Sequence, residues 1–80
     1  MSNNDKYKKI FVETFEIGEE HLDELEYQGI QEWDSVGHMS LIAAIEDVFD
    51  IMMDTDDIID FSSYKKGKQI LKKYGVEIWF

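Results

Sequence analysis

An Asp-Ser pair, Asp34-Ser35, stands directly before a run of residues with helical apolar spacing. A serine in the first turn of a helix presents its hydroxyl beside backbone N–H groups that lack a partner within the helix. The negative charge of a phosphodiester is tolerated there. Nothing in the sequence dictates a histidine or lysine as a base for Ser35, so another enzyme would have to drive its modification. Taken alone, such a pair is more often only a helix N-cap.

The rest of the chain offers little for other chemistry. It contains no cysteine, which excludes disulfides, thiolate metal sites and a cysteine nucleophile. His21 and His38 lack the spacing of a zinc site. Residues 54–57 begin like a calcium loop, but Ile59 and Lys65 stand where that loop needs glycine and glutamate. No nucleophile, base and oxyanion set can be assembled, so we expect no catalytic residues, no metal and no enzyme.

Charge is distributed unevenly along the 80 residues. All eight basic residues are lysines, and none lies between Ile10 and Tyr64. That middle carries 16 of the 18 acidic residues, and the net charge is −10. Nucleic acid is not an expected partner, because binding it requires basic groups against phosphates. The acidic middle favours docking on basic patches of other proteins, and charge that serves solubility alone is the alternative.

Apolar spacing and capping residues predict an all-α fold. The expected elements, in order, are a helix over residues 5–16, an ordered loop over 17–32 with a helical turn near 19–25, a helix over 35–50, a short helix or single turn over 56–61, and a last helix that Ser62-Ser63 caps and Gly75 stops. We therefore expect one domain, residues 1–80, folded as a small four-helix bundle with a long loop between helices 1 and 2 and a short helix 3. The tail 76–80 packs against the first helix, serves as a partner hook, or frays.

No apolar run approaches the roughly 20 residues that a membrane span requires, and the first residues lack the layout of a signal peptide. We therefore expect a cytoplasmic chain, a monomer, without a membrane partner.

The second helix has apolar residues on two sides. Its wide stripe, suited to a core, contains Leu41, Ile42, Ile45, Val48 and Phe49, and also Met52 if the helix extends that far. The opposite side carries Val36, Met39 and Ala43 beside Ser40, Glu46, Asp47 and Asp50. An apolar strip rimmed by carboxylates predicts a docking surface, where apolar atoms supply area and acids supply orientation. The alternative is that Val36 and Met39 pack under the long loop.

The segment from Asp34 to Asp50 resembles the second helix of acyl carrier proteins almost position by position, and agreement in element order extends this resemblance over about residues 6–75. The resemblance implies that Ser35 bears 4'-phosphopantetheine, transferred from coenzyme A by a phosphopantetheinyl transferase. It implies that Asp34 helps the transferase hold a magnesium ion or the serine proton. The attached thiol arm would carry acyl groups as thioesters.

The resemblance also implies two sets of binding residues. Synthases, acyl ligases and acyltransferases with basic patches would contact Val36, Met39, Ser40, Ala43, Glu46 and Asp47. The acyl chain would be sheltered by Ile45, Phe49, Ile59 and Phe61. The function implied is acyl carriage in fatty acid, polyketide or other specialised biosynthesis. The alternatives are an aminoacyl or peptidyl carrier for peptide or surface-glycan modification, and an unmodified acidic helical adaptor.

The sequence departs from the family pattern beside Ser35. Val36 stands where leucine is usual, and Gly37, His38 and Ser40 replace residues that are often acidic or helix-favouring. A glycine there costs up to about 1 kcal/mol and predicts a looser first turn. These departures suggest a specialised carrier with a dedicated partner. His38 has two interpretations: a gate or pH sensor for the arm, or a half-buried side chain bonded to a loop carbonyl.

Overall fold

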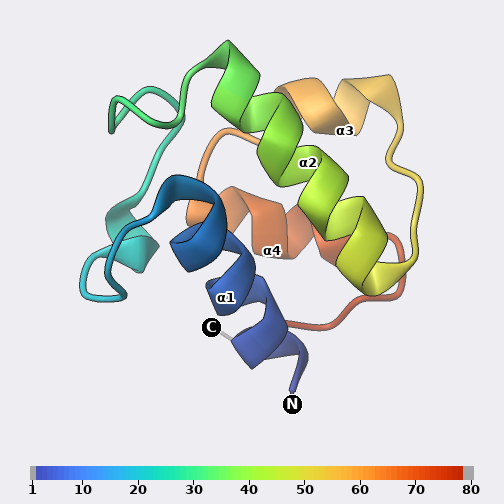
Figure 1. Ribbon diagram of the computed structural model, residues 1–80. Coiled ribbons are helices and arrows are strands. Elements are labelled where there is room, and N and C mark those ends of the chain that lie inside the picture. Colours follow the sequence, from blue (N-terminus) through green and yellow to red (C-terminus); the bar gives the residue numbers. More distant parts are fainter. Residues whose placement is uncertain (1, 79–80) are drawn as a thin grey trace.

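The computed structural model describes residues 2–78, and these residues form no β-strand. The elements are α1 (Asn3–Phe15), the short 3-10 helix η1 (Leu22–Glu24), α2 (Ser35–Phe49), α3 (Thr55–Asp60) and α4 (Tyr64–Lys72). The all-α prediction is thus confirmed. Figure 1 shows α3 beside the first half of α2, and α4 lies behind α1 and α2. Within residues 2–78, none of the helices combines the length and apolar character needed to cross a membrane.

Side-chain caps explain where the helices begin. The Ser2 hydroxyl accepts a hydrogen bond from the Asp5 N–H, so α1 starts two residues earlier than predicted. Ser63, the second of the two expected serines, accepts from the Lys66 N–H at 2.9 Å and opens α4. After α4, Gly75 has φ of 81°, which fits its predicted role as a stop because glycine adopts this conformation without steric strain.

The C-terminal ends of α1 and α2 are left-handed turns made by acidic residues. Glu16 and Asp50 both have φ of 54°, and each donates its backbone N–H back into the last helical turn. Because α2 ends there, Met52 lies outside the helix and is 87% exposed. Val48 lies within the helix and is 42% exposed. The prediction of Val48 as a core residue is therefore wrong, and Met52 does not join the core stripe because the helix does not extend to it. Leu41, Ile42 and Ile45 are buried as expected.

An aromatic cluster forms the centre of the core. Phe11 of α1 is fully buried and lies against the rings of Tyr7, Phe15, Trp33, Phe61 and Tyr64. The Tyr7 hydroxyl donates to the Tyr64 backbone carbonyl at 2.6 Å. Burial, together with the nearby Tyr64, raises the pKa of Tyr7 well above its usual value. The cluster connects α1, the long loop and α4 through side chains far apart in the sequence.

The loop between α1 and α2 is pinned by its own side chains, as expected for an ordered loop of this length. Leu22, Leu25 and Trp33 are buried, and η1 forms within the region predicted to hold a helical turn. Backbone bonds join Tyr27 N–H to the Ser62 carbonyl at 2.8 Å and Tyr64 N–H to the Leu25 carbonyl at 2.9 Å. The loop is therefore fastened to the start of α4.

The described part of the tail packs onto the helices. Val76 and Ile78 are buried, and the Asn3 side chain of α1 donates to the Glu77 carbonyl at 3.3 Å. This agrees with the first of the three alternatives for the tail. Residues 79 and 80 of the predicted tail lie outside the described residues.

Candidate functional site

Ser35 is the first residue of α2, and it is exposed. Asp34 precedes it as the N-cap, and its carboxylate accepts a hydrogen bond from the Gly37 N–H at 2.8 Å. The Asp34 carboxylate therefore has a structural role in starting the helix, in addition to any role toward a transferase. The serine hydroxyl lies beside the free N–H groups of a helix N-terminus, a favourable place for an anionic group.

A cavity of about 350 Å³ lies beside Ser35. We call it the groove, and its walls come from the long loop, α2, α3 and the residue that ends α3. Its lining residues are Tyr27, Ser35, His38, Met39, Ile58, Ile59 and Phe61. Most of these side chains are apolar or aromatic, so the groove suits an uncharged chain or ring more than a charged group.

The predicted docking face is accessible along most of its length. Val36 is 75% exposed and Met39 is 56% exposed, so the alternative in which they pack under the loop is wrong. Ser40, Ala43 and Asp47 are also exposed. Glu46 differs, because it is half-buried and its carboxylate accepts from the Met53 N–H at 2.9 Å. It fastens the segment after α2 to the helix, which leaves Asp47 as the freer carboxylate of the pair.

The four residues expected around an acyl chain are divided between two places. Ile59 and Phe61 line the groove, although Ile59 is 72% exposed. Ile45 is fully buried in the core and Phe49 is half-buried against it, and neither lines the groove. The structure thus brings only two of the four to the cavity beside Ser35. Tyr27, Met39 and Ile58 complete that cavity.

His38 joins three segments at the inner end of the groove. The Trp33 indole N–H donates to His38 Nδ1 at 3.0 Å, and His38 Nε2 lies 2.7 Å from the Ile58 carbonyl oxygen. The ring is half-buried, stacked on Trp33 and edge-on to Tyr27 and Phe61. The expected carbonyl partner is present, but it belongs to α3 rather than to a loop.

A second polar connection joins α3 to the residues after α4. Asp57, the buried residue of α3, receives hydrogen bonds from the Lys73 amine at 2.6 Å and from the Tyr74 hydroxyl. These hydrogen bonds, that of Lys73 first, hold the pKa of Asp57 below its usual value. Tyr74 also accepts from the Asp54 N–H at 2.9 Å. Asp57 is therefore part of a hydrogen-bonded cluster with Lys73 and Tyr74.

Gly37 does not simply loosen the first turn of α2. A Cβ atom at this position would lie 2.0 Å from the Glu32 carbonyl oxygen and 3.3 Å from the Phe15 ring. The loop backbone therefore approaches α2 so closely that only glycine fits. The prediction of a looser turn missed this contact, which depends on the path of the loop.

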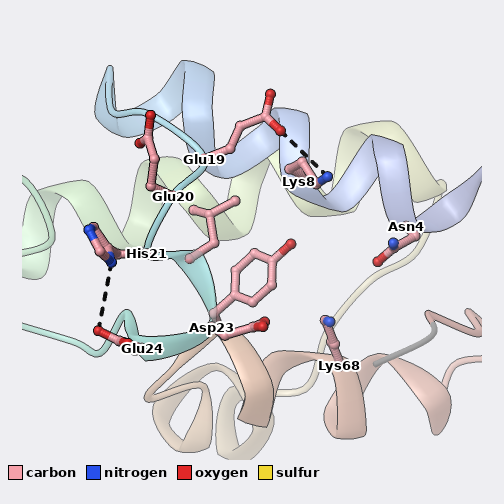
Figure 2. A pocket seen from close by; sticks show the side chains of 10 residues that line it. Asn4, Lys8, Glu19, Glu20, His21, Asp23, Glu24 and Lys68 are labelled. Atoms are coloured by element: carbon pink, nitrogen blue, oxygen red, sulfur yellow. Dashed lines mark ion pairs between the residues drawn. The ribbon is translucent and has the colours of Figure 1, made fainter.

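A second cavity of about 350 Å³ lies away from Ser35, between α1, η1 and α4 (Figure 2). Lys8 and Glu19 form an ion pair across it at 3.5 Å, and the Lys68 amine lies 5.0 Å from the centre of the Tyr64 ring. Burial, followed by the charges of Asp23 and Glu19, raises the pKa of Tyr64 to about 12. The cavity combines lysines and carboxylates, and none of the predicted site residues lines it.

Three residues of the site were not predicted, and one of them, Ile58, lines the groove from α3. Trp33 is fully buried and supplies the donor for His38, and Tyr27 forms the loop wall of the groove. A buried tryptophan needs a partner for its N–H, and this requirement was the signal available in the sequence. Within residues 2–78, no group of three or more histidine, cysteine or acidic side chains is placed to hold a metal ion.

Comparisons of this chain with models of protein families, with curated protein sequences and with solved structures gave no significant match.

Proposed function

We propose that this chain is a discrete carrier protein of the acyl carrier type, with 4'-phosphopantetheine attached to Ser35. The observation that carries the proposal is the position of Ser35. Its hydroxyl is exposed at the first turn of α2, and the same residue borders an apolar groove of about 350 Å³. A helix cap alone would not require a cavity beside the serine.

The site residues fit such a group in chemical terms. The helix N-terminus favours the negative charge of the phosphodiester. Asp34 caps the first turn through its hydrogen bond from the Gly37 N–H and remains exposed to solvent. The groove offers Met39, Ile58 and Ile59 to the arm or its cargo. When bound, the prosthetic group would supply the thiol that this cysteine-free chain lacks.

The surface around Ser35 supports a role in docking. Val36 and Met39 expose apolar area, Asp47 supplies negative charge, and no lysine occurs between Ile10 and Tyr64. Transferases, ligases, synthases or acyltransferases with basic patches would be attracted to this face. In this proposal the helices form the small bundle of a carrier domain, which acts as a cytoplasmic monomer in lipid, polyketide or related biosynthesis.

Incubation with coenzyme A, magnesium and a broad-range phosphopantetheinyl transferase tests the proposal. We expect intact-mass spectrometry to show the gain of one phosphopantetheine and thiol titration to rise from zero to one per chain. Ser35→Ala should show neither change. The control is Ser62→Ala, which changes an exposed serine outside the docking face of α2 and should be modified like the parent.

The main competing function is an acidic helical adaptor that is never modified. A parent chain that gains no mass, together with partner binding that Ser35→Ala leaves unchanged, would favour that function and overturn ours. Within the carrier class, trapping the loaded thioester from cells distinguishes an acyl group from an aminoacyl group.

A further inference from the structure

We infer that His38 is a positioning residue that holds α3 as one wall of the groove beside Ser35, so that release of this side chain opens the groove. The purpose of the groove rests on the proposed function, but the contact itself can be tested on the unmodified chain. Three features of the structure support the inference.

The first feature is the weak apolar attachment of α3. Asp57 is the one buried residue of this six-residue helix, whereas Ile58 is half-buried and Ile59 is 72% exposed. A segment that buries little apolar surface opens locally at low free-energy cost. Its own residues are therefore held mainly by two polar connections, Asp57 with Lys73 and Tyr74, and His38 with Ile58. The flanking residues Asp54 and Phe61 fasten its two ends.

The second feature is the fixed state of the His38 ring. An indole N–H can only donate, so His38 Nδ1 must carry a lone pair to accept from Trp33, and Nε2 then carries the hydrogen that is donated to the Ile58 carbonyl. Trp33 is fully buried, and loss of its acceptor would leave a buried donor unsatisfied. The ring is thus held in one neutral tautomer that satisfies both partners.

The third feature is that the same ring also lines the groove. His38 contacts the rings of Tyr27 and Phe61, which are groove residues from the loop and from the end of α3. A change in the ring therefore reaches the three walls that surround Ser35. The contacts of Phe11 with Tyr7 and Phe15 do not involve His38.

Protonation supplies a way to release the contact. An imidazolium ring has two N–H donors and no acceptor, so its Nδ1–H would oppose the Trp33 N–H. Its Nε2–H can still donate to the Ile58 carbonyl, so this second contact is lost only when the ring turns to relieve the opposition at Trp33. The groups that face the ring are Tyr27, Trp33, Phe61 and the Ile58 carbonyl. The neighbouring carboxylates Asp34 and Asp57 are bonded to Gly37 and to Lys73 and Tyr74. A turn of the protonated ring away from Trp33 would therefore loosen α3.

Hydrogen exchange of residues 55–60, followed by mass spectrometry on the unmodified chain, tests the contact. His38→Ala removes donor and acceptor, and we expect exchange in this segment to be about tenfold faster at pH 8 while α1 stays protected. The control His21→Ala changes the other histidine, whose side chain is 82% exposed, and should leave exchange unchanged. Equal exchange of residues 55–60 in the parent and in His38→Ala would overturn the inference.

A pH series separates positioning from simple packing. After correction for the intrinsic rates, exchange of residues 55–60 in the parent should increase between pH 8 and pH 5, whereas His38→Gln, which keeps an acceptor and a donor but does not titrate, should show no such increase. Trp33→Phe should also lose the response, because its protonated His38 no longer meets an opposing N–H. The same increase in the parent and in His38→Gln would overturn the inference.

A further test uses the two variants with the prosthetic group attached to Ser35. The thiol of the attached arm should react faster with a neutral aromatic disulfide in His38→Ala than in His21→Ala, because the opened groove shelters the arm less. Equal rates would overturn the role of the contact in holding the arm. Failure of Ser35 to accept the group would overturn the proposed function and leave the exchange result standing. Unchanged exchange with normal loading would overturn only the inference.

Discussion

The aromatic core and α3 are held by different forces. Around Phe11, fully buried rings from α1, the loop and α4 pack against one another, and the Tyr7 hydroxyl satisfies a backbone carbonyl. Helix α3 instead buries one carboxylate and relies on hydrogen bonds to His38, Lys73 and Tyr74. Burial of apolar area stabilises the aromatic core under most conditions. The stability of α3 instead depends on pH, because its hydrogen bonds involve titratable groups.

The difference matters because Ser35 lies at the boundary between the two regions. Its helix is anchored in the core through Leu41, Ile42 and Ile45, and its groove is closed by α3. A rigid attachment point beside a weakly held wall is suited to a site that must first hold a group and then release it. Substitutions in each region should therefore have separable effects.

Phe11→Ala should give the largest effect, because it removes the ring at the centre of the core. We expect a loss of about 3–5 kcal/mol in the free energy of unfolding, measured by urea denaturation. Val36→Ala, which shortens a 75% exposed side chain of α2, should change it by less than about 0.5 kcal/mol. Comparable losses in the two variants would mean that the core does not dominate stability.

Gly37→Ala should give the second-largest change in the free energy of unfolding. The sign of this change shows whether helix propensity or the contact with the loop dominates at this position. Alanine is the better helix former by about 1 kcal/mol, yet its Cβ would meet the Glu32 carbonyl at 2.0 Å. Because a backbone atom cannot move away cheaply, we expect a net loss of about 1–3 kcal/mol in the same measurement. Ser40→Ala, on the exposed side of α2, should be neutral or slightly stabilising. A more stable Gly37→Ala variant would show that the loop is not fixed against α2.

Asp57→Asn should give the smallest global effect, since the Lys73 side chain is 63% exposed and solvent screens this pair. The pKa of Asp57 is lowered in the folded chain, so its contribution is present above the ordinary value of 3.8 and is lost as the pH falls through the lowered value. Parent stability should therefore fall more steeply than that of Asp57→Asn below about pH 4.

The matched control for that acid titration is Asp56→Asn, which removes an exposed carboxylate from the neighbouring position of α3. For all three chains, stability is measured by thermal unfolding between about pH 5 and pH 2.5. The stability of Asp56→Asn should fall with pH in parallel with that of the parent. If the Asp57→Asn curve also runs parallel to the parent, Asp57 does not hold α3 through its charge.

Helix positions and the location of Ser35 could be predicted because their signals are local. Apolar spacing identified the helices, and the caps Asp34 and Ser63 act on N–H groups only three residues away. The accessible strip on α2 followed from helix geometry, since Val36 and Met39 point away from the core stripe. Such inferences need no knowledge of how the elements pack.

The remaining features depend on contacts between distant segments. Gly37 is explained by the path of the loop, the burial of Asp57 by Lys73 and Tyr74, and the groove by Tyr27. Met52 is exposed because the left-handed Asp50 ends α2 close to the predicted position, so the helix does not carry Met52 to the core. Burial of a polar or glycine residue cannot be inferred until its partner is known.

The contact between Asn3 and Glu77 places the two ends of the described chain side by side, and Figure 1 shows both at the opposite end of the molecule from the start of α2. A short linker could therefore join them, and the backbone could be reopened in an exposed turn such as the one after Ile17. A fluorophore or surface tether attached at either end would likewise stay clear of the groove, which makes this chain a convenient scaffold for immobilised or permuted versions of the site.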